Sequence, residues 1–115
     1  MTKGKIFLVL FPYNDLSTNK LPPAACLTNP MGVRRHVLLA YITSHIPIPL
    51  QETNIKLDAN HPDFVATGLH QSSVIRLHHI VTVSTVVIQR ELGELPSDIQ
   101  AQITEKLCHF LTEQA

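Results

Sequence analysis

The hydrophobic pattern of the chain changes near residue 96, and this change limits the folds that it can adopt. Before that point the apolar residues come in short runs, which are typical of strands. After it they recur at helical spacing, as a stripe formed by Ile99, Ile103, Leu107, Phe110 and Leu111. Strands followed by one terminal helix predict a mainly β fold with minor α content, a small twisted β-barrel packed by a C-terminal helix.

Four apolar segments before the helix are predicted to be strands. They are bounded by turn residues such as Pro12 and the Asn29-Pro30 pair, which cannot continue a regular ladder. Their side chains are mostly Val, Ile, Leu, Ala and Phe, which suit a buried sheet. The predicted strands cover residues 4–11, 24–28, 36–43 and 72–83, and the last of them is expected to turn near its end.

The sequence predicts the secondary structure of two segments less clearly. Residues 44–68 contain three prolines and predict extended or irregular chain, so any strand there should lie at a sheet edge. Residues 84–95 fit either a short helical turn or a strand. The helix that follows has a capping-box pattern, with Ser97 three residues before Gln100, and Asp98 in its first turn suits the helix dipole.

Length and composition predict one domain over residues 1–115. Hydrophobic residues make up 44% and charged residues 16%, as in folded soluble chains. No apolar run reaches the roughly 18 residues of a membrane span, and no signal peptide is recognisable, so we expect a cytoplasmic protein that makes no use of a membrane. Cys26 and Cys108 lie in apolar stretches and are expected to be buried thiols in a reducing cytosol.

Charge is unevenly distributed along the chain. Residues 1–51 carry five Lys or Arg and one acid, which gives +4, and residues 52–115 carry four Lys or Arg and eight acids, which gives −4. A basic N-terminal half could bind an anion such as RNA phosphate. The alternative is the chance fluctuation of charge that any short chain shows.

The histidines do not form a metal-binding motif. No pair shows an HExxH pattern, and the cysteines form no CxxC, so no metal and no cofactor is predicted. Two of the histidines are adjacent on a predicted strand, where neighbouring side chains point to opposite faces and cannot chelate one ion. The seven are His36, His45, His61, His70, His78, His79 and His109.

Hydroxyl groups gather where the third predicted strand ends. In "YITSH", Thr43 and Ser44 are followed directly by His45. Hydroxyls at a strand end can donate to a phosphate oxygen, and a neighbouring cation can stabilise charge as a phosphodiester is attacked. The alternative is that both hydroxyls bond to local backbone and simply close the strand.

Three stretches together resemble a known family. They are "KGKIFLVLFPYNDLSTNKLPPAACLTN", "VLLAYITS" and "TGLHQSSVIRLHHIVTVSTVVIQRELGEL". Their order and spacing resemble the MazF/PemK family of toxin endoribonucleases, whose pattern includes K-x-R-P-A, then I-T-S, then S-V-[VI]-R-L. The resemblance covers nearly the whole chain.

The resemblance implies a function as well as a fold. The fold is a small β-barrel of the Src-homology type with a C-terminal helix. The implied function is a toxin of a type II toxin-antitoxin system, a homodimer that cuts single-stranded RNA, including mRNA, without a metal. Such enzymes leave a 2′,3′-cyclic phosphate and a 5′-hydroxyl. A MazE-like antitoxin would cover the site and block it.

The resemblance also implies site residues. The catalytic hydroxyls fall on Thr43 and Ser44. Arg76 falls on the arginine of S-V-[VI]-R-L, where it either binds substrate or is a charge on the barrel surface. Asp15 lies in the loop after the first strand, as a groove residue or as a cap of that loop. The remaining residues that we predict to bind RNA are Tyr13, Asn14, Ser17, Asn19, Lys20 and His45.

One position departs from the family pattern. Pro22 stands where K-x-R-P-A has its catalytic arginine, and proline has neither a charge nor a backbone N–H. We therefore expect weak or absent activity. Three explanations are open: a natural degenerate toxin, an arginine codon changed by one base in an escape mutant, or a rebuilt site that takes its cation from Lys20, Arg34, Arg35 or His45. The alternative function is a non-catalytic, antitoxin-binding or autoregulatory module of the same fold.

Overall fold

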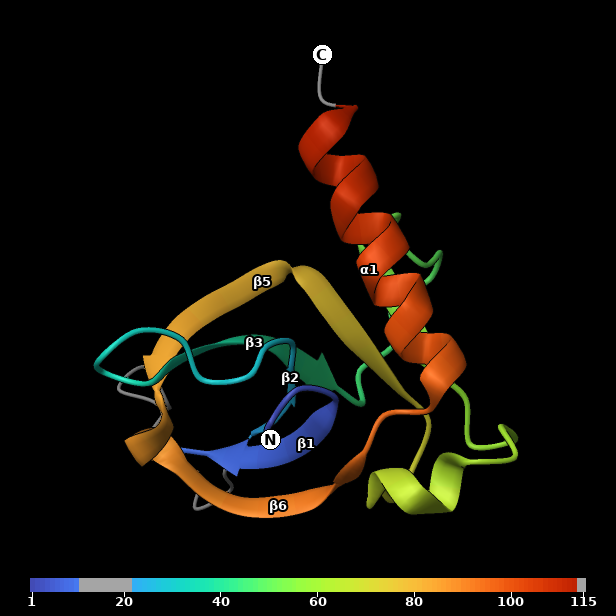
Figure 1. Ribbon diagram of the computed structural model, residues 1–115. Coiled ribbons are helices and arrows are strands. Elements are labelled where there is room, and N and C mark those ends of the chain that lie inside the picture. Colours follow the sequence, from blue (N-terminus) through green and yellow to red (C-terminus); the bar gives the residue numbers. More distant parts are fainter. Residues whose placement is uncertain (11–21, 114–115) are drawn as a thin grey trace.

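The computed structural model describes residues 1–10 and 22–113. Within them, six strands are followed by one α-helix (Figure 1). Two short 3₁₀ helices, η1 (Phe64–Thr67) and η2 (Thr85–Val87), lie in the connections. The strands are β1 (Lys5–Val9), β2 (Pro23–Cys26), β3 (His36–Thr43), β4 (Asn54–Leu57), β5 (Ser73–Ser84) and β6 (Ile88–Glu94), and the helix is α1 (Ser97–Thr112).

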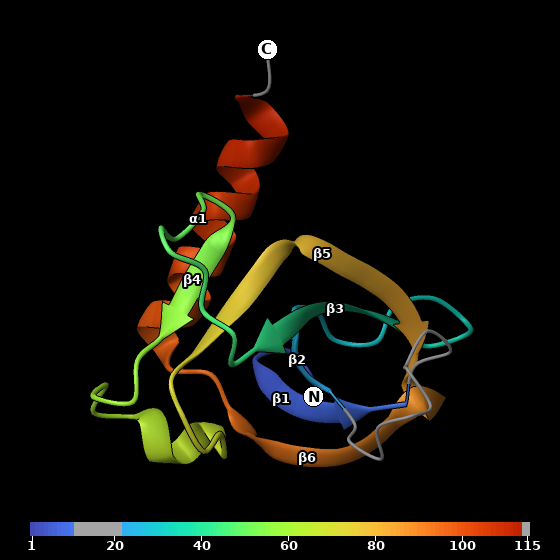
Figure 2. The ribbon, with the colours of Figure 1, turned by 180° about the vertical axis from the view of Figure 1, so that it is seen from behind.

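The strands form one antiparallel sheet in the order β4-β5-β3-β2-β1-β6. Figures 1 and 2 show that this sheet is rolled, with β1, β2 and β3 inside the curve that β5 and β6 make around them. Among the described strands β4 and β6 remain edges, so the roll is not a closed barrel. The mainly β fold with a C-terminal helix is confirmed.

Apolar side chains fill both faces of the sheet. Because successive residues of a strand point to opposite faces, β1 places Ile6 in one buried cluster and Phe7 in the other. The same alternation places Ala40 of β3 in the first cluster and Leu39 in the second. The first cluster includes Ile99 and Ile103 of α1, and the second consists of residues from β1, β2 and β3.

The apolar stripe of α1 is buried only in its first half. Ile99 and Ile103 pack into the first cluster, and Leu107 and Phe110 are half-buried against it. Leu111, which the helical spacing placed on the same stripe, is 84% exposed. The reason is visible in Figure 1, where the C-terminal half of α1 projects beyond the sheet. The apolar stripe predicted from the spacing therefore packs on the sheet only in part, and Leu111 is not buried by it.

The predicted capping box is also wrong. The helix is capped by Pro96 without any side-chain cap, and Ser97 is the first residue inside the helix. Gln100 instead donates its side-chain amide to the carbonyl oxygen of Leu95, at 2.9 Å. Proline disfavours a helical conformation in the residue before it, so Leu95 is not helical and the helix begins after Pro96.

Other predictions have mixed outcomes. Residues 84–95 form both of the proposed structures, since η2 is followed at once by β6. The irregular segment contains η1 and one strand, β4, which lies at a sheet edge as expected. Cys26 is buried and Cys108 is exposed, and both are free thiols, so the expected burial of Cys108 is wrong. None of the described helices has the length and apolar character to cross a bilayer.

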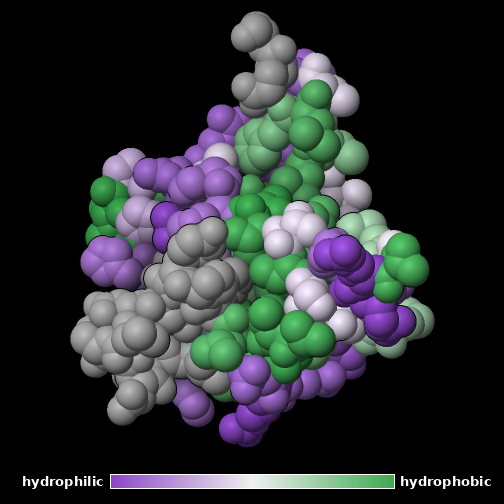
Figure 3. Space-filling view, turned by 90° about the vertical axis from the view of Figure 1, so that its left-hand side faces the viewer, coloured by the Kyte–Doolittle hydropathy of each residue, from purple (hydrophilic) through white to green (hydrophobic). Residues whose placement is uncertain are grey.

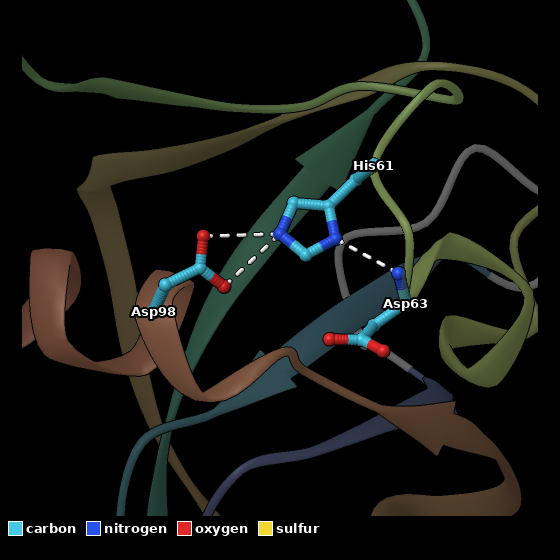
Figure 4. A network of polar contacts seen from close by, with 3 residues as sticks. All are labelled: His61, Asp63 and Asp98. Atoms are coloured by element: carbon cyan, nitrogen blue, oxygen red, sulfur yellow. Dashed lines mark hydrogen bonds and ion pairs between the residues drawn. The ribbon is translucent and has the colours of Figure 1, made fainter.

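A polar network joins the loop before η1 to the start of α1 (Figure 4). The backbone N–H of Asp63 donates to Nδ1 of His61 at 3.0 Å. A backbone N–H can only donate, so Nδ1 is the acceptor and the ring proton lies on Nε2. Nε2 lies 3.0 Å from each carboxylate oxygen of Asp98. This hydrogen bond from His61 holds the pKa of Asp98 below its ordinary value.

The lowered pKa of Asp98 predicts how stability depends on pH. A carboxyl whose folded-state pKa is depressed stabilises the protein above its unfolded-state pKa, and this contribution is lost as pH falls through the folded-state value. Asp98→Asn should therefore lose less stability than the parent chain when urea unfolding midpoints are compared at about pH 5 and about pH 3. Asp63→Asn is the matched control, because Asp63 contacts His61 through its backbone. An identical pH dependence of the parent and Asp98→Asn would contradict this prediction.

Candidate functional site

A wide bulge in β5 shapes the region around the end of β3. Ala40 of β3 pairs with Ile80, and Ile42 pairs with Ile75. Residues 76–79 of β5 therefore stand opposite Tyr41 alone. Such an insertion bends the strand that carries it, and bulges often occur beside functional sites. Figure 1 shows the result as a sharp bend in the middle of β5.

Within the bulged segment, Leu77 and the residues on either side of it line different surfaces. Leu77 is buried in the core under α1, and its backbone N–H donates to the carbonyl oxygen of Thr53 at 2.9 Å. Arg76 and His78, on either side of Leu77, therefore point away from that core. They meet the end of β3 and the turn before β4.

These elements enclose a pocket of about 310 Å³. It is built from the end of β3 and the residues after it, from the turn into β4, and from the bulge of β5. Among the described residues its lining has no carboxylate. The lining residues are Thr43, His45, Pro47, Gln51, Asn54, Arg76 and His78.

Thr43 offers a hydroxyl proton to this pocket. Its Oγ1 accepts the backbone N–H of His45 at 3.1 Å. A hydroxyl has one proton to donate and can accept elsewhere, so this contact uses only its acceptor capacity. The proton of Thr43 is thereby left available for an acceptor in the pocket, such as a phosphate oxygen.

Arg76 is the fixed positive charge of the pocket. It is half-buried, and it forms no ion pair with any carboxylate among the described residues. On β4 its paired residue is Asn54, whose side-chain oxygen already accepts the backbone N–H of Gln51 at 2.8 Å. A partly buried guanidinium without a carboxylate favours the binding of an anion, since its five N–H donors fit phosphate in a fork.

Pro22 lies beside the same strand end. The pairing of β2 with β3 ends at Ala24 and Tyr41, and extending its register by two residues would set position 22 opposite Thr43. Directly opposite residues of an antiparallel pair share a face. The carbonyl oxygen of Pro22 accepts the backbone N–H of Val9 at 3.3 Å, which ties this position to β1. A longer side chain at position 22 would thus start on the face that Thr43 occupies.

The other predicted site residues are distributed as follows. His45 lines the pocket, whereas Ser44 is exposed and does not line it. Arg34 and Arg35 precede β3, whose eight residues span roughly 25 Å, so the structure does not bring them to Thr43. The predicted loop residues lie outside the described part of the chain: Tyr13, Asn14, Asp15, Ser17, Asn19 and Lys20.

Comparison with known families agrees with this architecture. Residues 2–111 match the family described as PemK-like, MazF-like toxin of type II toxin-antitoxin system. The chain belongs to this family. Membership implies an antitoxin partner for this PemK/MazF-like toxin. No curated protein matches the sequence closely enough to add to this.

Solved structures support the fold of this PemK/MazF-like toxin. MazF from Deinococcus radiodurans is 21% identical, with 96% of each chain covered and a TM-score of 0.70. The Mycobacterium tuberculosis toxin MazF-mt6 is also 21% identical, with 93% of this chain and 95% of that chain covered and a TM-score of 0.66. A further structure, described as an Mtb toxin, is 19% identical, with 91% and 98% covered and a TM-score of 0.64. At this identity the similarity shows the fold.

Four lining residues of this toxin's pocket were not singled out as site residues from the sequence: Pro47, Gln51, Asn54 and His78. For His78 a signal existed, because it lies two residues after Arg76 on a strand and so shares its face. Gln51 and Asn54 had no such signal, since their place depends on the pairing of β4 with β5. Within the described residues no cluster of three or more metal-binding side chains is formed.

Proposed function

We propose that this protein is a toxin endoribonuclease that cuts single-stranded RNA without a metal, and that Pro22 impairs it. The observation that carries this proposal is the half-buried Arg76, unpaired with any described carboxylate, in one pocket with the hydroxyl of Thr43. A phosphodiester would be held by the guanidinium and would receive a hydrogen bond from the hydroxyl. Cleavage of mRNA in the cytoplasm would inhibit growth.

The proposed reaction uses the RNA's own 2′-hydroxyl as nucleophile. Its oxygen attacks the adjacent phosphorus, and the bond to the 5′-oxygen of the next nucleotide breaks. Negative charge that develops on the phosphate oxygens is stabilised by donors fixed before the reaction. Thr43 and Arg76 are the donors that we assign to this role, and the family likeness would add an arginine at position 22.

The impairment follows from what proline cannot do. A guanidinium at position 22, opposite Thr43, would contribute charge and several N–H donors, whereas proline contributes neither. Loss of one such donor commonly lowers a rate by about 10²–10³. We propose that the RNA-binding groove is completed by the loop with Tyr13, Asn14, Ser17, Asn19 and Lys20, and that the basic N-terminal half adds affinity for RNA.

A second copy of the chain is the partner that we propose for an apolar groove elsewhere on the surface. This groove has a volume of about 540 Å³ and includes Leu38, Ile80, Leu107, Phe110 and Leu111. Figure 3 shows hydrophobic side chains gathered along the middle of this face, below the C-terminus. Burial of such surface is favourable, and exposed patches of this kind mark interaction sites. A homodimer would cover it.

A second candidate function is a module that binds antitoxin without cutting RNA. The observation that favours it is Pro22, because a site without its guanidinium can keep its shape and lose its chemistry. In that case the pocket and the neighbouring groove would hold a MazE-like antitoxin, and the complex would act in autoregulation.

An assay of substrate class separates these functions. Single-stranded RNA, double-stranded RNA and single-stranded DNA of one sequence are incubated with the parent chain at high enzyme concentration in EDTA. We expect slow cleavage of the single-stranded RNA alone. DNA lacks the 2′-hydroxyl nucleophile, and the duplex does not leave the backbone of one strand free to place its 2′-hydroxyl in line with the bond that breaks. Cleavage of DNA, or cleavage that EDTA abolishes, would contradict the proposed mechanism. Antitoxin binding with no cleavage, even after arginine is restored at position 22, would favour the second function.

A further inference from the structure

His78 has a hydrogen-bond partner that can both donate and accept. Its Nδ1 lies 2.7 Å from the hydroxyl oxygen of Thr53. A hydroxyl can donate to a neutral imidazole nitrogen and can accept from a protonated one. The contact is therefore compatible with both charge states of the ring, and Nε2 remains for a ligand in the pocket.

His61 shows the opposite arrangement. Its Nδ1 accepts the backbone N–H of Asp63. A backbone N–H cannot accept a hydrogen bond, so it could not pair with a proton on Nδ1. That ring joins the loop before η1 to the start of α1 and serves the structure. The difference singles out His78 as an imidazole suited to a proton cycle.

His45 approaches the same pocket from the other side. It follows the end of β3, and only its backbone N–H is used in the bond to Thr43. Its ring is exposed, and it forms no hydrogen bond or ion pair among the described residues. The pocket thus has one imidazole from the exit of β3 and one from the bulge of β5, with Arg76 two residues before His78.

The other lining residues cannot exchange protons near neutral pH. Hydroxyl and amide groups do not titrate there, and arginine stays charged. His78 also lines the apolar groove proposed above for a second copy of the chain. The residues that α1 contributes to this groove are Leu107, Phe110 and Leu111, and none of them titrates. The charged group in the turn before β4 is Glu52, whose carboxylate lies 3.8 Å from His109.

We propose that His45 and His78 are the acid–base pair of this pocket, an inference that rests on the proposed ribonuclease function. One ring, neutral, takes the proton of the 2′-hydroxyl as the O2′–P bond forms. The other ring, charged, gives its proton to the 5′-oxygen as the P–O5′ bond breaks. The products are the 2′,3′-cyclic phosphate and the 5′-hydroxyl, and imidazole is the side chain that performs both tasks near pH 7.

Kinetics in the Pro22→Arg background test the pair. His45→Gln and His78→Gln should each lower kcat by about 10²–10⁴ with little change in KM, and each should remove one limb of a bell-shaped pH profile. His79→Gln is the matched control. Its ring lies 6.3 Å from that of His78 and 4.8 Å from that of Tyr41, and it does not line the pocket.

The outcomes distinguish the proposed acid–base pair from the proposed ribonuclease function. If Pro22→Arg cuts RNA and the two glutamine variants keep its kcat and pH profile, the acid–base pair is overturned while the ribonuclease function stands. If no variant cuts RNA, this result contradicts the proposed ribonuclease function and therefore also the proposed acid–base pair.

A binding measurement tests the site without turnover. The parent chain is titrated with the 2′,3′-cyclic phosphates of the four common nucleosides, and the imidazole proton signals are followed by NMR. We expect the signals of His45 and His78 to shift and that of His79 to stay. If the imidazole signals of His45 and His78 both stay unchanged, the assignment of these residues as the acid–base pair is overturned.

Discussion

Replacing Pro22 with arginine should raise the rate of RNA cleavage by about 10²–10³. Position 22 stands opposite Thr43 when the pairing of β2 with β3 is continued, so the new guanidinium would begin on the same face as that hydroxyl. It would add a second fixed cation to Arg76 and could bind two phosphate oxygens in a fork. The measurement is the single-turnover rate on single-stranded RNA in EDTA.

Two control variants separate charge from backbone effects. Pro22→Ala relieves the constraint on the chain without adding a cation, and we expect no gain from it. Pro22→Lys adds charge without the planar fork, so its gain should be smaller than that of arginine. Equal gains from alanine and arginine would mean that proline acts through the backbone. A parent chain as fast as Pro22→Arg would mean that the pocket works without a guanidinium at position 22.

Thr43→Ala in the Pro22→Arg background should lower the cleavage rate by at least about 10². The hydroxyl of Thr43 accepts the backbone N–H of His45, so its proton is available for a phosphate oxygen. Alanine removes this donor, and it also releases the backbone that places His45 at the pocket. The measurement is again the single-turnover rate, with the unfolding midpoint recorded to show that the variant is folded.

Thr43→Ser is the matched variant for this prediction. Serine keeps the hydroxyl and loses only a methyl group, so most of the activity should remain. If Thr43→Ala in the Pro22→Arg background cuts RNA as fast as Pro22→Arg alone, Thr43 has no role in the reaction. A loss of similar size in Thr43→Ser and Thr43→Ala would indicate that the methyl group, rather than the hydroxyl, matters.

Much of the fold could be predicted because its signals are local. The apolar runs of β1 and β3 and the helical spacing of Ile99 and Ile103 depend on residues close in sequence. The exposure of Leu111 could not be read in this way, since it depends on where the sheet ends below α1. The helix start was misjudged because Pro96 outweighs the pattern of a capping box.

The candidate site was harder to predict because it depends on pairing between distant segments. The bulge opposite Tyr41 brings Arg76 and His78 to the end of β3. No pattern of neighbouring residues in the sequence predicts a bulge of this width. Arg34 was a reasonable cation from sequence alone, but the length of β3 separates it from Thr43. Thr43 was singled out as a hydroxyl at a strand end, a feature that sequence does carry.

The chemistry of the cut ends tests the central claim most directly. Single-stranded RNA is incubated with Pro22→Arg in EDTA, and the fragments are analysed by mass spectrometry. If Thr43 and Arg76 bind a phosphodiester that the 2′-hydroxyl attacks, every cut should leave a 2′,3′-cyclic phosphate and a 5′-hydroxyl. Fragments with a 3′-hydroxyl and a 5′-phosphate would mean that water attacks instead, and this result, or no cleavage at all, would contradict the account.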